Sequence, residues 1–270
     1  MIYIWICAVI LCFLAYMHFE TTLLKKSSIT FSKSSKGLKI VHLSDIHINK
    51  LYISADKIIK SIAEIKPDII LLSGDYIEKE KNIPEFIKFL SPIAANYPVY
   101  LTLGNHDHKA LKYNIEKISS FINLIHKTGA AVLLNESIRI EKNNTCYNII
   151  GIDDLKHGNP DINRAFKDIV SSINSDCINI AFSHNPDIVL SLPPEKVDYL
   201  LCGHFHGGQI WMPFHLEFKL MRKENLSKLG YYRGLHKVRG INIYINRGLG
   251  NVVFPFRLFS RPEITAIQMP

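Results

Sequence analysis

The chain has 270 residues, of which 47% are hydrophobic and 21% charged, and its formal net charge is +8. This length suffices for one domain whose core needs no disulfide support, and the hydrophobic content excludes wholesale disorder. The positive charge favours an anionic partner such as phosphate, nucleic acid or an acidic membrane surface, and charge alone does not choose among them.

Residues 1–22 are expected to form a membrane anchor. No charged residue occurs from residue 2 to residue 17, a stretch slightly shorter than the ~20 residues that usually span a bilayer. The positive-inside rule places the flank that follows it in the cytoplasm, with the N-terminus outside, because the lysines come after the apolar stretch. An uncleaved export signal is the alternative. The lysines are Lys25, Lys26, Lys33 and Lys36.

The rest of the chain divides into a basic linker, residues 23–36, and one domain, residues 37–270. The five cysteines have no paired spacing, so we expect reduced thiols in a cytosolic environment rather than disulfides or zinc ligands. They are Cys7, Cys12, Cys146, Cys177 and Cys202.

The first half of the domain alternates between strand and helix patterns. Short apolar runs predict strands at 38–43, 69–72 and 99–103, and apolar positions at helical spacing predict helices at 54–66 and 84–95. Asp45, Asp75 and Asn105 follow the three strands at intervals of 30 residues, about the length of one βαβ unit. Right-handed crossovers would bring all three to one edge of a parallel sheet.

The second half is richer in strands. Together the patterns predict the α/β class, with layered helices and two sheets. Helices are expected at 109–127 and 161–173, and strands at 132–134, 147–152, 178–182, 197–202, 209–212, 241–245 and 264–268.

Five short polar segments contain nearly all of the side-chain oxygen and nitrogen donors that point to a function, and each follows a β-prone stretch. One such histidine alone would be read as a hydrogen-bonded core residue. Asp, Asn and His side chains collected at strand ends instead suit two divalent ions, with a carboxylate such as Asp75 shared between them. Mixed nitrogen and oxygen donors favour Mn, Fe or Zn over Ca or Mg. The segments are DIH (45–47), GD (74–75), GNHD (104–107), SHN (183–185) and GHFH (203–206).

In this order, the blocks resemble the calcineurin-like metallophosphoesterases over residues 38–270. The resemblance implies two mixed sheets packed as a sandwich between helices, and hydrolysis of a phosphoric ester or pyrophosphate by a metal-activated hydroxide. It also implies that His106 contacts the leaving group and that Asp107 orients His106. The implied ligands are Asp45, His47, Asp75 and His206 for one ion, and Asp75, Asn105, His184 and His204 for the other.

The tail resembles the membrane-associated YkuE/YaeI-like branch of that family, through residues 203–210, 232–235, 246–250 and 261–264. Phe205 stands where this branch often has Thr. The branch includes the UDP-2,3-diacylglucosamine pyrophosphatase of the chlamydial type, which implies a manganese-dependent enzyme of lipid A synthesis with a lipid-linked nucleotide substrate. A general phosphodiesterase acting on nucleotides or envelope polymers, and a scaffold without catalysis, are the alternatives.

Basicity is better explained by a phosphate substrate and an anionic membrane surface than by nucleic acid, since no recognition helix, zinc finger or aromatic RNA-binding block occurs. Apolar and basic residues near the tail could form a lipid-facing surface beside the site, or could be sheet core and solvated arginines. They are Phe214, Leu216, Phe218, Leu220, Met221, Phe254, Phe256, Leu258 and Phe259, with Arg233, Arg247, Arg257 and Arg261.

Overall fold

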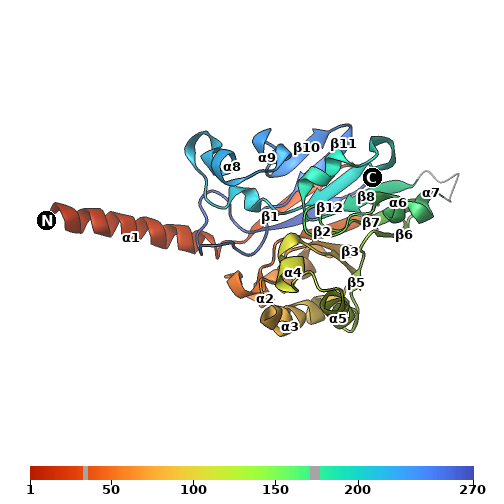
Figure 1. The fold of residues 1–270 in the computed structure, drawn as a ribbon, viewed down its shortest axis with the longest axis horizontal. Helices are drawn as coiled ribbons and strands as arrows, with labels where there is room; N and C mark the ends of the chain where they lie inside the picture. Colours follow the sequence, from red (N-terminus) through yellow and green to blue (C-terminus); the bar gives the residue numbers. More distant parts are fainter. Residues whose placement is uncertain (33–35, 171–176) are drawn as a thin grey trace.

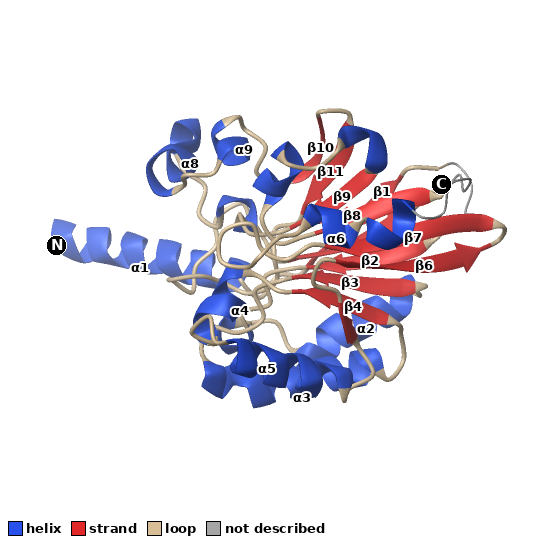
Figure 2. Cartoon of the chain, turned by 45° about the vertical axis from the view of Figure 1, so that its right-hand side comes forward, coloured by secondary structure: helices blue, strands red, loops and turns tan. Residues whose placement is uncertain are grey.

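Two mixed β-sheets lie face to face between layers of helices in the computed structural model, which describes residues 1–32, 36–170 and 177–270 (Figures 1 and 2). In spatial order, the first sheet contains β1 (Lys25–Thr30), β12 (Glu263–Gln268), β2 (Lys39–Leu43), β3 (Ile69–Ser73), β4 (Val99–Thr102) and β5 (Ala131–Val132). The second contains β10 (Gly234–Val238), β11 (Ile241–Ile245), β9 (Tyr199–Cys202), β8 (Ile178–Phe182), β7 (Thr145–Gly151) and β6 (Glu136–Lys142). This confirms the predicted fold class.

Helix α1 (Ile2–Glu20) precedes the sheets, and the other helices lie between strands in the chain. These are α2 (Ala55–Ile65), α3 (Ile83–Ala94), α4 (Asn105–Ala110), α5 (Ile115–His126), α6 (Ile162–Ala165), α7 (Lys167–Val170), α8 (Leu216–Met221) and α9 (Asn225–Lys228). Short 3₁₀ turns lie at Ile48–Lys50, Glu80–Asn82, Pro186–Leu190, Pro194–Lys196, His206–Gly208 and Pro213–His215.

The parallel strands β2, β3 and β4 form the centre of the first sheet. Alternate residues of a strand point to opposite faces, so Ile40 and Leu71 pack against the second sheet. Val41 and Ile70 pack instead into the core under α2, α3 and α5. Burial on both faces explains why these strands are continuous apolar runs, and the parallel order brings their carboxyl ends to one edge.

Some predicted elements are wrong in position or type. Residues 25–30, expected to be part of a linker, form the edge strand β1, whose polar, Lys-containing sequence suits an exposed sheet edge. The helix predicted at 109–127 is divided into α4 and α5 by Lys112 and Tyr113, which both have positive φ, and Asn114 then caps α5. The strand predicted at 209–212 is reduced to a single bridge between Ile210 and Leu258.

The helix predicted at 161–173 is two short helices, α6 and α7, and its last residues, 171–173, lie outside the described part of the chain. The strands β6 and β10 were not predicted. Each is an edge strand with alternating half-buried and exposed residues, so neither has the continuous apolar run of a central strand.

One cysteine prediction is also wrong, because Cys146 and Cys177 form a disulfide. They stand just before the paired residues Tyr147 and Ile178 of the neighbouring strands β7 and β8, a proximity that the linear spacing does not reveal. Cys202 is a buried free thiol, as expected.

Helix α1 is long and apolar enough to cross a membrane, and only 6% of its apolar window is buried by the rest of the chain. A signal sequence meets the same criteria. In Figure 1 the helix extends away from the body as a separate rod.

Candidate metal centre

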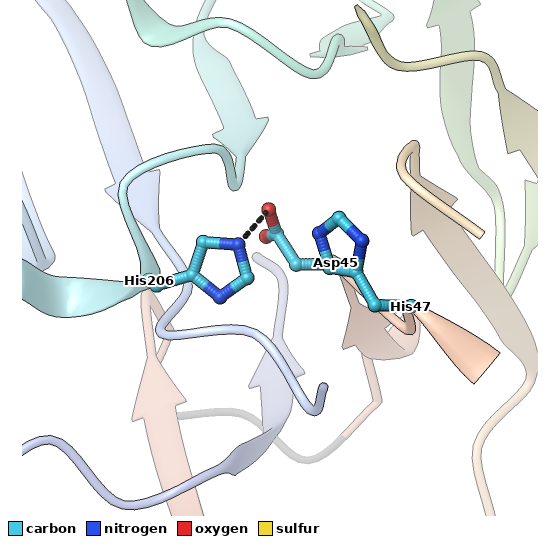
Figure 3. A group of neighbouring side chains, drawn as sticks. All are labelled: Asp45, His47 and His206. Atoms are coloured by element: carbon cyan, nitrogen blue, oxygen red, sulfur yellow. Dashed lines mark ion pairs between the residues drawn. The ribbon is translucent and has the colours of Figure 1, made fainter. Parts of the chain in front are cut away.

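Three of the expected ligands meet where β2 and β9 end. Asp45 and His47 follow β2, and His206 follows β9. Nε2 of His206 lies 3.3 Å from Oδ1 of Asp45, and the rings of His47 and His206 stack with centroids 5.1 Å apart (Figure 3). The three side chains are buried and offer donor atoms within 4.8 Å of one another, a spacing at which all three reach one cation.

A second group lies beside the first. Asp75 follows β3, His184 follows β8, and His204 follows β9. Their donor atoms also lie within 4.8 Å of one another, with Nε2 of His184 at 3.0 Å from Oδ2 of Asp75. The same Oδ2 atom lies 3.6 Å from Nε2 of His47 in the first group. Asp75 therefore stands between the groups, in the place that a shared carboxylate requires.

The backbone is strained where these ligands occur. Five of the seven expected ligands have positive φ, a region that residues other than glycine seldom adopt. Such conformations persist where the surrounding structure enforces them, and they cluster at functional sites. The five are Asp45 (49°), His47 (38°), Asp75 (60°), His204 (73°) and His206 (50°).

Two glycines allow the loops to approach each other. Gly74 has φ of +84°, and a Cβ there would lie 2.7 Å from the backbone of Gly104 and 2.9 Å from Cβ of His184. At Gly203, a Cβ would overlap the Asp45 carboxylate. The glycines of the GD and GHFH segments are thus required by close packing of the site.

Hydrogen bonds set the orientation of two imidazoles. Nδ1 of His184 donates to the Ser73 carbonyl at 2.8 Å, so Nε2 is the ring nitrogen that faces Asp75. Nε2 of His204 donates to the Glu224 carboxylate at 3.1 Å, which leaves Nδ1 facing His184. Partners of this kind commonly fix the tautomer of metal-binding histidines. Sequence reasoning missed Glu224, because it lies outside every recognisable motif.

Buried donor atoms without a partner test whether a cation pair fits the site. Among the described residues, seven buried side-chain atoms make no hydrogen bond, and four of them belong to expected ligands: Oδ1 of Asn105, both ring nitrogens of His47 and Nδ1 of His206. Buried polar atoms are normally satisfied, so this concentration of unsatisfied atoms at one place calls for a partner. The donor set therefore fits a pair of divalent cations.

The electrostatics agree with this fit. Burial lowers the pKa of His204 to about 4, against the effect of its hydrogen bond to Glu224, so the imidazole is neutral at neutral pH. Burial and the neighbouring His47 hold the pKa of His206 well below its usual value. Burial would lower the pKa of His184 too, but the Asp75 carboxylate raises it to about 10. A cation would take the place of that proton, since ligation requires neutral imidazole.

The structure gives Asp107 a role different from the expected one. Oδ2 accepts the backbone N–H groups of Asp75 (2.8 Å) and Gly104 (2.9 Å), and Oδ1 accepts those of Tyr76 (2.8 Å) and Ile77 (3.1 Å). The carboxylate thus ties the loop after β3 to the loop after β4, and its bonds hold the backbone rather than the ring of His106.

The carboxylate near His106 is instead Glu78, which the sequence reasoning did not select. Oε1 of Glu78 lies 3.3 Å from Nδ1 of His47 and 4.0 Å from Nδ1 of His106. The His47 imidazole, against the effect of burial, lowers the pKa of Glu78 to about 2, so it is ionised. Its place three residues after Asp75, on the same loop, was the available signal.

A cavity of about 340 Å³ opens over the two groups. His106, with 30% of its side chain exposed, faces this space. Lys50 and Arg222 also line the cavity, which places cationic groups where the oxygens of a phosphate would lie.

Comparisons with known proteins agree with the geometry. Residues 38–208 match the model of the calcineurin-like phosphoesterase family. The chain is 31% identical to the uncharacterized metallophosphoesterase YkoQ of Bacillus subtilis, over 87% of this chain and 84% of that protein. It is 30% identical to the phosphodiesterase YaeI of Escherichia coli, over 94% and 92%. It is 26% identical to the UDP-2,3-diacylglucosamine pyrophosphatase LpxG of Chlamydia muridarum, over 93% and 91%.

Two crystal structures share the fold. TT1561 of Thermus thermophilus has a TM-score of 0.50 at 12% identity, covering 79% of this chain and 90% of that one. A 5'-nucleotidase from Candida albicans has a TM-score of 0.51 at 12% identity, covering 79% and 46%. With two donor groups joined at one carboxylate on this fold, the chain belongs to the calcineurin-like phosphoesterase family and is a hydrolase with a candidate dinuclear metal site.

Proposed function

We propose that this protein hydrolyses a phosphodiester or pyrophosphate bond in a nucleotide-linked lipid, using two divalent cations held by the seven expected ligands. The observation that carries the proposal is the position of Oδ2 of Asp75 between the two donor groups. A scaffold without catalysis is disfavoured, because the sequence retains all seven expected ligands and six of them lie in the two donor groups.

The cations would be held by Asp45, His47, Asp75 and His206 on one side, and by Asp75, Asn105, His184 and His204 on the other. When bound, such a pair lowers the pKa of water and neutralises negative charge on phosphoryl oxygens. Mn²⁺ is the proposed ion, with Fe or Zn as alternatives, since the donors mix imidazole nitrogen with carboxylate and amide oxygen.

The other residues of the cavity bind and orient the substrate. Lys50 and Arg222 stand where they can hold phosphate oxygens. His106 is placed to donate a proton to the leaving oxygen, and Glu78 is a positioning residue that orients both His47 and His106. The backbone N–H of His106 donates to Oδ1 of Asp75 at 2.7 Å, and this bond fixes the position of the proposed acid relative to the shared ligand.

UDP-2,3-diacylglucosamine is the substrate we propose, supported by the name of the relative LpxG and by an apolar cavity beside the metal groups. The name of YaeI supports the second candidate, a general phosphodiesterase. The discriminating experiment is an assay of the Mn²⁺-loaded full chain with UDP-2,3-diacylglucosamine and, separately, with a chromogenic phosphodiester. UMP release from the lipid alone supports the first candidate, and turnover of the chromogenic compound alone supports the second. Asp75→Asn is the inactive control for both.

We also propose that α1 anchors the chain in the cytoplasmic membrane, with the domain, residues 37–270, on the cytoplasmic side because the lysines follow the helix. The Cys146–Cys177 disulfide favours the opposite side, since such bonds persist in oxidising compartments. One variant decides between the two. Glu195 is exposed, so Glu195→Cys, in a chain with Cys7→Ala and Cys12→Ala, is treated with an impermeant maleimide on intact spheroplasts. No labelling before lysis supports the cytoplasmic side, and labelling of intact spheroplasts contradicts it.

A further inference from the structure

Helix α1 is fastened to the loop beside the metal cavity. The backbone N–H of Arg257 donates to the carbonyl of Met17 at 3.0 Å, in the last turns of the helix. The Glu20 carboxylate, almost fully buried, accepts the backbone N–H of Phe259 at 2.8 Å. These bonds fix the direction in which α1 leaves the body relative to residues 252–261.

Exposed apolar side chains gather around this attachment. Phe259 packs its ring against Trp211 with centroids 5.9 Å apart, and both Val252 and Phe254 accept hydrogen bonds from the Gln209 side chain through their carbonyls. We name this set the apolar face. It comprises Trp211 (38% exposed), Phe214 (80%), Val253 (69%), Phe254 (58%) and Phe259 (57%).

The structure also decides which of the expected surface residues are core. Phe218 is buried in the hydrophobic core beside the second sheet. Arg257 is fully buried, and its guanidinium donates hydrogen bonds to backbone carbonyls. The side chains of Leu220 and Met221 lie outside the described part of the structure. The apolar face is therefore smaller than the sequence suggested, and it is joined to the end of α1 through Phe259, which bonds Glu20 and packs on Trp211.

An apolar cavity connects this face to the metal site. It has a volume of about 190 Å³ and is lined by residues including Phe205, Phe218 and Phe254. Arg222, Val252 and Val253 line both this cavity and the one over the metal ligands. Pockets for whole small molecules usually measure about 300–1,000 Å³, so the apolar cavity suits a segment of a hydrocarbon chain rather than a complete ligand.

We propose that the apolar face rests in the interface of a phospholipid bilayer, beside the point where α1 enters it, so that the metal site opens onto the membrane surface. The exposed lysines Lys219 and Lys223, on or next to α8, provide attraction to anionic lipid headgroups. A segment of the substrate's acyl chain then occupies the apolar cavity, with its phosphate at Arg222. The contact of the apolar face with the bilayer depends on membrane anchoring by α1. The acyl-chain subsite in the apolar cavity depends on the proposed function.

Single exposed apolar residues are common on soluble proteins. This face differs because it is continuous with the end of an uncovered apolar helix and with the opening of the site. Contiguous apolar patches of this kind mark membrane or protein contacts, and the fastening of α1 selects the membrane.

Fluorescence quenching tests whether the apolar face contacts the bilayer, and it does so without an activity assay. The chain has two tryptophans, so Trp5→Phe leaves Trp211 as the sole reporter in the full chain in nanodiscs. Brominated phospholipids should quench this reporter strongly relative to ordinary ones. The matched control carries Trp5→Phe, Trp211→Phe and Leu124→Trp. Leu124 is likewise 38% exposed and lies near the end of α5, the helix that leads into the start of β5, so it is away from the carboxyl ends of the strands that form the site. Equal quenching of both reporters, or none at Trp211, overturns the proposal.

A second experiment tests whether the apolar face presents a lipid substrate to the site. Phe214→Ser combined with Phe259→Ser should lower turnover of a lipid-presented substrate about tenfold, as expected for the loss of apolar contact with the membrane. Turnover of a water-soluble chromogenic diester should stay within about twofold of wild type, because neither side chain lines the metal cavity or the apolar cavity. An equal effect on both substrates contradicts the presentation of lipid by this face. If neither substrate is turned over by the wild type, the proposed function fails, while the quenching result still decides whether the apolar face contacts the bilayer.

Discussion

Nε2 of His184 lies 3.0 Å from Oδ2 of Asp75, although the two residues follow strands of different sheets. This contact joins the sandwich at the edge where the strands end. It means that neither sheet alone contains the metal site, since each contributes ligands to it.

His106→Ala should leave the metal content unchanged while lowering turnover by about 10²–10⁴-fold, the usual contribution of a proton-transfer group. The reason is that His106 faces the cavity and is not among the seven expected ligands. Metal analysis and steady-state kinetics of the same preparation measure both quantities. His157→Ala, at an exposed histidine outside the site, is the control and should behave as wild type. Full activity of the His106 variant would remove it from the mechanism.

Glu78→Gln should lower kcat about 10–100-fold, as is typical when a carboxylate supporting a metal-binding histidine is lost. The substitution keeps the shape but removes the negative charge beside His47 and His106. Because the charge of Glu78 favours the protonated form of His106, the proposed acid, the alkaline limb of the kcat profile should also move to lower pH in the Glu78 variant. Glu80→Gln is the matched control, since Glu80 is exposed and pairs with Lys117. Equal kcat for both variants would contradict the positioning role.

Asp107→Asn should act mainly through stability. The new amide group faces backbone N–H donors that the carboxylate now satisfies, and unsatisfied buried groups cost about 1–3 kcal/mol each. A loss of about 2 kcal/mol corresponds to a fall of roughly 4–8 °C in melting temperature for a chain of this size. Asp161→Asn, which replaces one good helix cap by another, should change it little. An unchanged melting temperature for Asp107→Asn would show that these bonds are dispensable.

His42 should make stability sensitive to acid. It is fully buried beside the Ser73 hydroxyl, and burial lowers its pKa from 6.5 to about 3. Above pH 6.5 it is neutral in both states. Between pH 6.5 and 3 only the unfolded chain takes up the proton, so stability falls as the pH falls, by about 2 kcal/mol at pH 5.

The test is urea unfolding at pH 7 and pH 5 with a chelator present, so that loss of cations does not add to the pH dependence. His42→Gln keeps a partner for Ser73 and should reduce the difference between the two pH values by about 2 kcal/mol. An unchanged difference would show that His42 is protonated in the folded chain.

The sequence predicted the order of the central strands and most of the side chains that gather at their ends, because both depend on local patterns. Asp45, Asp75 and Asn105 follow continuous apolar strands at a regular interval, and a parallel sheet has only one edge where such ends can meet. The edge strands β1, β6 and β10 could not be predicted in the same way. Their residues are half-exposed and often polar, so they lack the apolar pattern of a strand that is buried on both faces. These strands form by pairing with neighbours that are distant in the chain.

The supporting residues were less accessible to sequence reasoning than the ligands. Glu224 reaches His204 from a loop with no motif of its own, and Glu78 acquires its place only when the loops after β2 and β3 are folded together. Asp107 stands next to His106 in the chain, yet the helical turn of α4 directs its carboxylate to the backbone of another loop. Adjacency in sequence therefore misassigned its role.

The proposed site requires two cations that share Asp75. Anomalous diffraction from crystals of the Mn²⁺-loaded full chain, together with elemental analysis of the wild type and Asp75→Asn, measures this sharing. The wild type should contain about two ions per chain, one on each side of Oδ2 of Asp75, and the variant less than one. Fewer than one ion in the wild type, or anomalous peaks away from Asp75, would contradict it.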